Sequence, residues 1–287
     1  MSFVVIPVLA DADALVANLK GVTGILHLAS PLAIETEDYE KDIVQPALAV
    51  TNSVLSAAER TPSINRVVIT SSAVTLIPFE WLSNPDISKT YTEKDLNSNP
   101  TTPYHSSIEA YWASKALSRM AAHTFLTTHP KLHFEIIQLL PSVVIGPDAL
   151  ATTASSIFSS TRTLAMGPIL GQTFPSPLVG VSVHVDDVAR AHVDALKESV
   201  EGNKEYVLTS DTPEGIEWND GLAIAKKYFP EAVKKGILKL GGGMQTQKWK
   251  INTSATEKAF GWKCQNFETT INDLVGQYVE LSEAGAE

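Results

Sequence analysis

The sequence lacks the features of a disulfide-stabilised, membrane-spanning or nucleic-acid-binding protein. Its 287 residues include one cysteine, Cys264, which excludes an internal disulfide framework and favours a reducing compartment such as the cytoplasm. No apolar run is long enough to span a membrane. The net charge is −10 without a basic cluster, which disfavours nucleic acid and anionic membranes as partners. The seven histidines show no metal-ligand spacing, so we expect no metal site.

Strand and helix patterns alternate through the first two thirds of the chain. Short β-rich or apolar runs, each of strand length, occur at residues 3–7, 25–29, 66–70, 134–140, 181–185 and 205–208. Helical periodicity predicts helices at 38–60, from residue 108 onward, at 218–229 and at 267–281. This alternation is typical of βαβ units and predicts a parallel sheet. The chain length suits one large domain, or a domain with a smaller lobe.

A tyrosine and a lysine lie four residues apart near the start of the helix predicted from residue 108. Tyr111 and Lys115 therefore lie one turn apart on the same helix face, where both polar groups can reach a single pocket. A nearby ammonium group lowers the pKa of a tyrosine towards the range of a general acid or base. Taken alone, this spacing is more often a packed ring beside a solvated charge. The catalytic interpretation therefore depends on the other motifs.

Five motifs follow one another along the chain: HLASP at 27–31, VITSSA at 68–73, YWASK at 111–115, PSVVIGP at 141–147 and VHVDDVARAH at 183–192. Together they resemble extended short-chain dehydrogenase/reductases of the dihydroflavonol reductase and cinnamoyl-CoA reductase type. Fungal carbonyl reductases belong to the same group, which is part of the NAD-dependent epimerase/dehydratase family. The resemblance extends from about residue 3 to the C-terminal helix.

The resemblance implies an α/β fold with an N-terminally truncated, Rossmann-like, doubly wound parallel sheet and a small C-terminal substrate lobe. Residues 1–150 would form the sheet domain, to which residues 180–210 return. Residues 151–179 and 211–287 would form the substrate-binding lobe.

The resemblance also implies roles for individual residues. Tyr111 would be the general acid that protonates a carbonyl oxygen, and Lys115 would lower its pKa and hold the nicotinamide ribose. Ser72 would hydrogen-bond the same substrate oxygen, with Ser71 as the alternative because neighbouring strand positions face opposite ways. Without the tyrosine, the two serines would be interpreted as a turn at a strand end. Further residues expected to line the site of an NADP or NAD cofactor are Ala29, Ser30, Pro141, Val143 and Val144.

Two features of the fifth motif are expected to be structural. Asp186 and Asp187 precede a helical pattern and are typical N-cap residues. His184 lies in an apolar run, and we expect a hydrogen-bonded core histidine there rather than a catalytic one.

The family begins with a strand, a glycine-rich turn and a helix whose N-terminus holds the cofactor pyrophosphate. Here residues 3–7 correspond to the family's third strand, so we expect this glycine-rich βαβ unit to be missing. The glycines at 241–243 follow an apolar residue but open no helix, and they do not replace it. NAD(P) binding is then expected to be weak or undetectable, and the alternative to an NADP or NAD cofactor is no cofactor. We further expect residues 3–7 to pair directly with residues 25–29, with the outer edge or helices buried in a homodimer.

Three functions follow from these patterns. The first is an NAD(P)-dependent reductase of a ketone or aldehyde on a small molecule. The second is a cofactor-independent isomerase, dehydratase or cyclase that keeps the serine, tyrosine and lysine, and the third is a non-catalytic sensor or scaffold. The intact residue set counts against the third. Large apolar side chains in the C-terminal part favour an apolar, aromatic or polyketide-like substrate, although they are also ordinary core residues: Phe158, Met166, Phe174 and Trp249.

Overall fold

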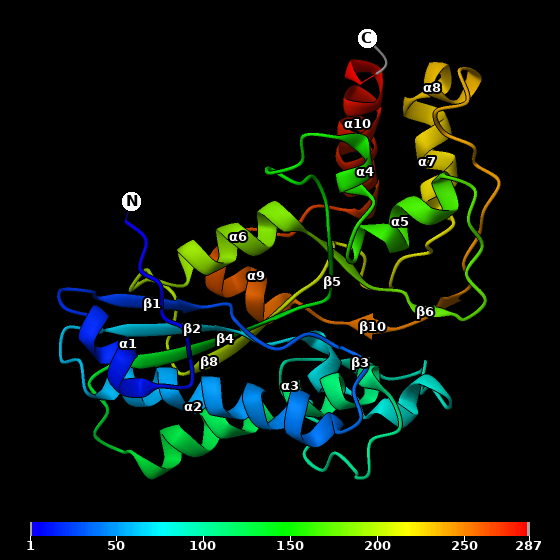
Figure 1. Ribbon diagram of the computed structural model, residues 1–287. Helices are drawn as coiled ribbons and strands as arrows, with labels where there is room; N and C mark the ends of the chain where they lie inside the picture. Colours follow the sequence, from blue (N-terminus) through cyan, green and yellow to red (C-terminus); the bar gives the residue numbers. More distant parts are fainter. Residues whose placement is uncertain (1, 286–287) are drawn as a thin grey trace.

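The computed structural model describes residues 2–285 and is built on a four-stranded parallel sheet (Figure 1). The strands run in the order β1-β2-β4-β8, and all three pairings are parallel. Their bounds are Gly24–His27 for β1, Arg66–Thr70 for β2, Glu135–Pro141 for β4 and Lys204–Leu208 for β8. These strands lie where the apolar runs predict them, and they form a Rossmann-like α/β sheet.

Strand β2 shows why helices cover both faces of the sheet. Val67 and Ile69 pack in one cluster with Leu55 of helix α2 (Gln45–Glu59). Val68 points to the opposite face and packs with Ala191 of helix α6 (Val185–Asp194). Both faces of the strand are therefore apolar and buried, as expected of a central parallel strand.

Helices α1 to α3 lie on one side of the sheet and helices α6 and α9 on the other (Figure 1). Helix α1 (Ala12–Asn18) begins at the N-cap Asp11, whose carboxylate accepts hydrogen bonds from two backbone N–H groups. The helix predicted over 38–60 begins as a π-helical turn, η1 (Glu40–Val44), and continues as α2. Helix α3 spans Ser107–Thr128, and helix α9 (Ser254–Phe260) covers β8.

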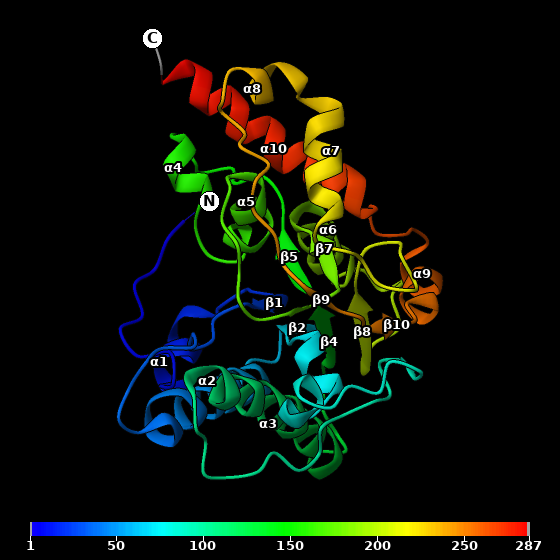
Figure 2. The ribbon, with the colours of Figure 1, turned by 90° about the vertical axis from the view of Figure 1, so that its right-hand side faces the viewer.

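A second group of elements forms a lobe above the carboxyl ends of the strands (Figures 1 and 2). Its helices share one hydrophobic cluster and are α4 (Ala154–Ile157), α5 (Arg162–Ile169), α7 (Asp220–Tyr228), α8 (Pro230–Lys234) and α10 (Phe267–Ala284). Three two-stranded parallel pairs complete the described fold: β5 (Val143–Ile145) with β7 (Ser182–His184), β6 (Leu178–Val179) with β9 (Thr246–Gln247), and β3 (Thr90–Tyr91) with β10 (Lys250–Ile251). None of the described helices has the length and apolar character needed to cross a membrane.

The predicted pairing of residues 3–7 with 25–29 is wrong. Residues 3–7 form no strand, and β1 pairs with β2 alone. The chain just after this segment is held elsewhere, because the carbonyl oxygen of Leu9 accepts a hydrogen bond from Ser53 on helix α2. Phe3 and Val5 are about nine-tenths exposed, so their backbone groups can hydrogen-bond with water instead of with a strand. The homodimer stays a prediction.

Three other expectations are corrected. His184, not Asp186 or Asp187, is the N-cap of α6, because its Nδ1 atom accepts a hydrogen bond from the Asp186 backbone N–H. Met166 and Trp249 are fully buried core residues rather than part of a substrate wall. Trp249 packs against Trp81 in an aromatic cluster, with ring centroids 5.7 Å apart.

A buried arginine at the start of β2 fastens helix α6 and its following loop to the sheet. The Nη1 atom of Arg66 donates to the carbonyl oxygens of Ala195 (3.0 Å), Lys197 (2.5 Å) and Val200 (2.9 Å), and Nη2 pairs with Glu135. Replacing a buried, multiply bonded cation leaves these acceptors without a partner.

We therefore expect Arg66→Met to lower the free energy of unfolding by about 3 kcal/mol in urea titrations. Arg60→Met is the control, because the Arg60–Asp13 pair is exposed and such pairs contribute at most about 1 kcal/mol. Equal losses in the two variants would contradict the anchoring role of Arg66.

Candidate functional site

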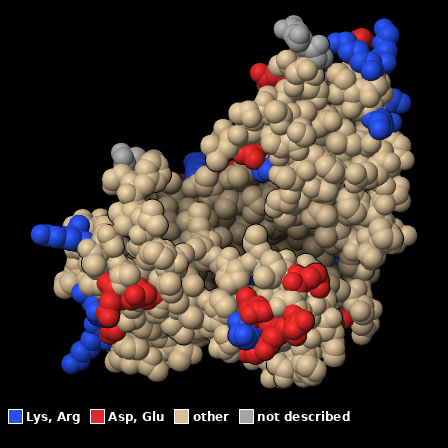
Figure 3. Space-filling view, in the orientation of Figure 1, with Lys and Arg blue, Asp and Glu red and all other residues tan. Residues whose placement is uncertain are grey.

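The carboxyl ends of three neighbouring strands meet at one edge of the sheet. Strand β1 leads into Ala29 and Ser30, β2 into Ser71 and Ser72, and β4 ends at Pro141. In open α/β sheets, ligands bind in the crevice outside the carboxyl ends of the strands. Figure 3 shows a hollow between the lobe and the lower part of the molecule, with mostly uncharged walls.

Helix α3 supplies the tyrosine and the lysine. It begins at the N-cap Ser106, whose hydroxyl accepts a hydrogen bond from the Glu109 backbone N–H. The Nζ atom of Lys115 lies 5.7 Å from the ring centroid of Tyr111, so the two side chains share one face as predicted. Lys115 is buried, and burial lowers its pKa to about 8 because an ammonium group is poorly solvated there.

The pKa of Tyr111 moves in the direction opposite to the one expected. Burial raises it, and a hydrogen-bond contribution from Ser72 lowers it by less. No lowering by Lys115 is found. The removal of the phenol from water therefore outweighs the effect of Ser72, and the neutral phenol is the stable form.

The two serines have different surroundings. Ser72 is the N-cap of a short 3₁₀ helix, η2 (Ala73–Leu76), and its hydroxyl accepts a hydrogen bond from the Val74 backbone N–H at 3.3 Å. It is also the serine that affects the Tyr111 phenol. The Ser71 hydroxyl is buried and has no hydrogen-bond partner among residues 2–285.

A small cleft beside Lys115 brings several expected cofactor residues together. Ala29, Ser30, Ser71 and Lys115 all line it. The cleft also contains His27, which sequence reasoning did not identify as a site residue. Burial, and next the positive charge of Lys115, lower the pKa of His27 to about 4, so its imidazole is neutral at pH 7. The HLASP motif at the end of a strand was the signal that could have identified it.

The remaining expected cofactor residues are divided between two surroundings. Val143 packs in the same hydrophobic cluster as Tyr111. Val144 packs on the opposite side of the sheet with the α6 cluster, and its carbonyl oxygen accepts a hydrogen bond from Thr161 at 2.6 Å. Pro141 is the last residue of β4 and has no N–H group to donate.

These residues fit the ribose and nicotinamide end of a dinucleotide. The buried Ser71 hydroxyl has no hydrogen-bond partner among the described residues, and both Ser71 and Lys115 line the cleft. Within the glycine run 241–243, Gly242 allows a close approach of two chain segments, because a Cβ atom there would lie 2.0 Å from the backbone of Gln172. The predicted lack of a glycine-rich unit in this protein stays a prediction.

A parallel Rossmann-like sheet, with serine, tyrosine and lysine side chains at the carboxyl ends of its strands, defines an extended short-chain dehydrogenase/reductase. The model of the NAD dependent epimerase/dehydratase family matches residues 7–209, and the chain belongs to this family.

Individual relatives agree with this membership. The chain is 35% identical over 271 residues to ketoreductase CTB6 of Cercospora nicotianae, covering 90% of this chain and 74% of that protein. It is 30% identical over 295 residues to NAD-dependent epimerase/dehydratase ALT6 of Alternaria alternata, covering 98% and 82%. The crystal structure of yeast methylglyoxal/isovaleraldehyde reductase Gre2 complexed with NADPH has a TM-score of 0.78 at 24% identity, covering 97% of this chain and 84% of that one, which shows the shared fold.

Proposed function

We propose that the protein is an NAD(P)-dependent reductase of a ketone or aldehyde on a small, apolar, aromatic or polyketide-like substrate. The observation that carries the proposal is the meeting of Ser72, Tyr111 and Lys115 at the carboxyl ends of the strands. The similarity to a ketoreductase and the family's NAD dependence support it.

The protein's own residues would supply binding, orientation and a proton. A bound nicotinamide nucleotide supplies the hydride that adds to the carbonyl carbon. The Tyr111 hydroxyl holds the proton that passes to the carbonyl oxygen, which completes the alcohol. The Ser72 hydroxyl hydrogen-bonds the same oxygen, and the Lys115 ammonium group holds the nicotinamide ribose.

The raised pKa of Tyr111 suits reduction. A general acid must carry its proton at the working pH, and burial keeps the phenol protonated. The carbonyl oxygen, on which negative charge develops during hydride addition, then receives this proton.

The surroundings of Tyr111 support an apolar substrate. Partly buried apolar side chains pack in its cluster, among them Phe79, Val143 and Leu178. Phe158 and Phe174, two of the residues proposed from the sequence, instead pack against the lobe's own core. The walls beside the tyrosine therefore replace them as the proposed substrate contacts.

The test combines a binding and a turnover experiment. NADPH and NADH are titrated against the protein by fluorescence, and oxidation of the nucleotide is followed with a panel of ketones and aldehydes. Ser72→Ala is expected to lower kcat about 100-fold and to leave nucleotide affinity unchanged, because in the proposed mechanism its hydroxyl acts on the reacting oxygen and not on the nucleotide. Ser282→Ala, on α10, is the control.

Failure of both nucleotides to bind would overturn the proposal. Conversion of a substrate without any nucleotide, lost in Ser72→Ala, would instead establish the isomerase, dehydratase or cyclase alternative.

A further inference from the structure

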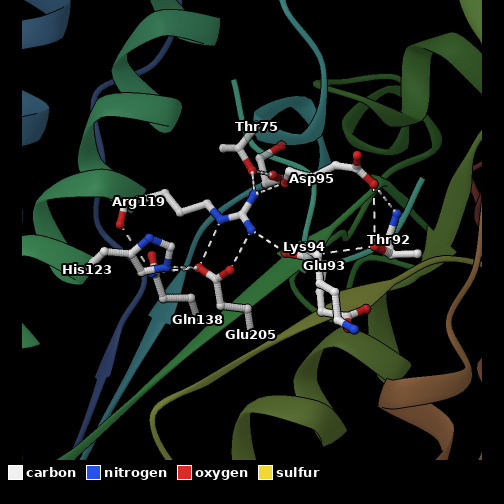
Figure 4. Close-up of polar contacts among 10 residues, drawn as sticks. Thr75, Thr92, Glu93, Lys94, Asp95, Arg119, His123, Gln138 and Glu205 are labelled. Atoms are coloured by element: carbon white, nitrogen blue, oxygen red, sulfur yellow. Dashed lines mark hydrogen bonds and ion pairs between the residues drawn. The ribbon is translucent and has the colours of Figure 1, made fainter. Parts of the chain in front are cut away.

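A buried arginine, Arg119, lies one turn beyond Lys115 on helix α3. Arg119 is 1% exposed. Its Nε atom donates to the Glu205 carboxylate at 2.9 Å, its Nη2 atom to the other oxygen of that carboxylate, and its Nη1 atom to the Thr75 hydroxyl at 3.0 Å (Figure 4). The guanidinium group thus joins helix α3 to strand β8 and to the 3₁₀ helix that follows Ser72.

The same guanidinium group holds a loop. It donates to the carbonyl oxygens of Glu93 and Asp95, at 2.5 Å and 2.8 Å (Figure 4). The Asn97 backbone N–H in turn donates to the carbonyl oxygen of Thr75 at 2.8 Å. Residues 93–97 are therefore packed against the turn that carries Ser72.

Thr75 connects this arginine to Ser72. Its hydroxyl accepts from Arg119 and lies 2.8 Å from the carbonyl oxygen of Ser72, to which it donates. The direction is fixed, because a guanidinium group only donates and a hydroxyl has one proton. The Thr75 backbone N–H donates to the same Ser72 oxygen at 3.1 Å, and the side chain of Thr75 is fully buried.

We propose that Arg119 and Thr75 are positioning residues that hold the backbone of Ser72 so that its hydroxyl meets the Tyr111 phenol. The inference rests on the roles of Ser72 and Tyr111 in the proposed function. Arg119 and Tyr111 belong to one helix, so the arginine ties the serine to the element that carries its partner. Arg119 also lines the cleft beside Lys115, but the hydrogen bonds of its guanidinium group go to Thr75, residues 93 and 95, and Glu205.

Thr75→Val tests the proposal with little change of shape, because it removes only the hydroxyl that connects Arg119 with Ser72. The readout is the pKa of Tyr111, measured by ¹³C NMR of labelled tyrosine and assigned with Tyr111→Phe. The Ser72 hydrogen bond lowers that pKa, so its loss must raise it. We expect Thr75→Val and Ser72→Ala each to raise the pKa of Tyr111.

The double variant distinguishes positioning from general destabilisation. If Thr75 acts through Ser72, Ser72→Ala/Thr75→Val has the same Tyr111 pKa as Ser72→Ala alone. With a carbonyl substrate, Thr75→Val is expected to lower kcat at least about tenfold with KM changed less than about twofold. His123→Asn is the matched control, because His123 Nε2 contacts Glu205 at 2.7 Å without reaching Thr75, and it should change neither readout.

An unchanged Tyr111 pKa in Thr75→Val overturns the proposal, as does a further rise in the double variant beyond Ser72→Ala. An unchanged pKa in Ser72→Ala overturns it too, because the serine would then not act on the phenol. The NMR titration contains neither nucleotide nor substrate. It therefore decides the positioning role even when the wild-type protein reduces no carbonyl compound, in which case the proposed function alone fails.

Discussion

Tyr111→Phe is expected to lower the rate of carbonyl reduction about 1000-fold while leaving the fold intact. The substitution removes one oxygen atom and its proton, and a positioned general acid contributes about 10²–10⁴-fold to a rate. Burial raises the pKa of Tyr111 and so keeps its phenol protonated, and Ser72 is close enough to affect that pKa. A phenylalanine ring fills the same apolar surroundings, so the packing around it should be kept.

Nucleotide oxidation with the best ketone or aldehyde gives kcat and KM, and circular dichroism and thermal melting report the fold. Tyr278→Phe, on helix α10 in the lobe, is the matched control and should retain full activity. A loss of no more than about fivefold in Tyr111→Phe would be far smaller than a general-acid effect. Such a result would show that Tyr111 is not the general acid.

Lys115→Met is expected to make the protein more stable and less active. Burial lowers the pKa of Lys115 from 10.5 to about 8, so the folded protein carries the cost of a poorly solvated ammonium group at neutral pH. A shift of this size corresponds to about 3 kcal/mol. Methionine is similar in length but uncharged, so burying it carries no such cost of lost charge solvation. Activity should fall because the ammonium group that would hold the ribose is lost.

The gain in stability should depend on pH in a defined direction. Below pH 8 the lysine is charged in both the folded and the unfolded state, and the whole penalty is present. Between pH 8 and 10.5 the folded protein releases the proton first, so the unfolded state binds more protons and the wild type gains stability with rising pH. Above pH 10.5 the side chain is neutral in both states, and the penalty disappears.

Urea titrations of wild type and Lys115→Met from pH 6 to 11 measure this difference. The variant's advantage should be largest below pH 8 and shrink towards zero above 10.5. Taking the difference cancels the effect of other groups on the pH dependence, such as Cys264, whose pKa burial raises from its ordinary value of 9 to about 12. Lys131→Met, at an exposed position, should show no such trend. A pH-independent advantage, or none, would contradict the burial argument.

Most of the sheet could be predicted because its signal is local. Residues 66–70 centre on the apolar run 67–69, and the structure places β2 over the same five residues. The helical periodicity of the apolar residues predicts helix α3. The four-residue spacing of Tyr111 and Lys115 then places them one turn apart, whatever the position of the helix in the fold. The N-terminal segment was less predictable. An apolar run at residues 3–7 is a strand only if a neighbouring strand accepts its hydrogen bonds, and none does so in this fold.

The sequence by itself determined the succession of strands and helices, the shared helix face of Tyr111 and Lys115, and the delivery of two serines to a strand end. These are properties of short stretches whose periods of 2 and 3.6 residues are visible in the residues themselves. Only the tertiary structure decided that Ser72 rather than Ser71 affects the phenol, and that burial raises the pKa of Tyr111. It also decided that Arg119 is linked to Ser72 through Thr75. Burial and contacts between segments far apart in the chain depend on how the elements pack, and no local pattern records them.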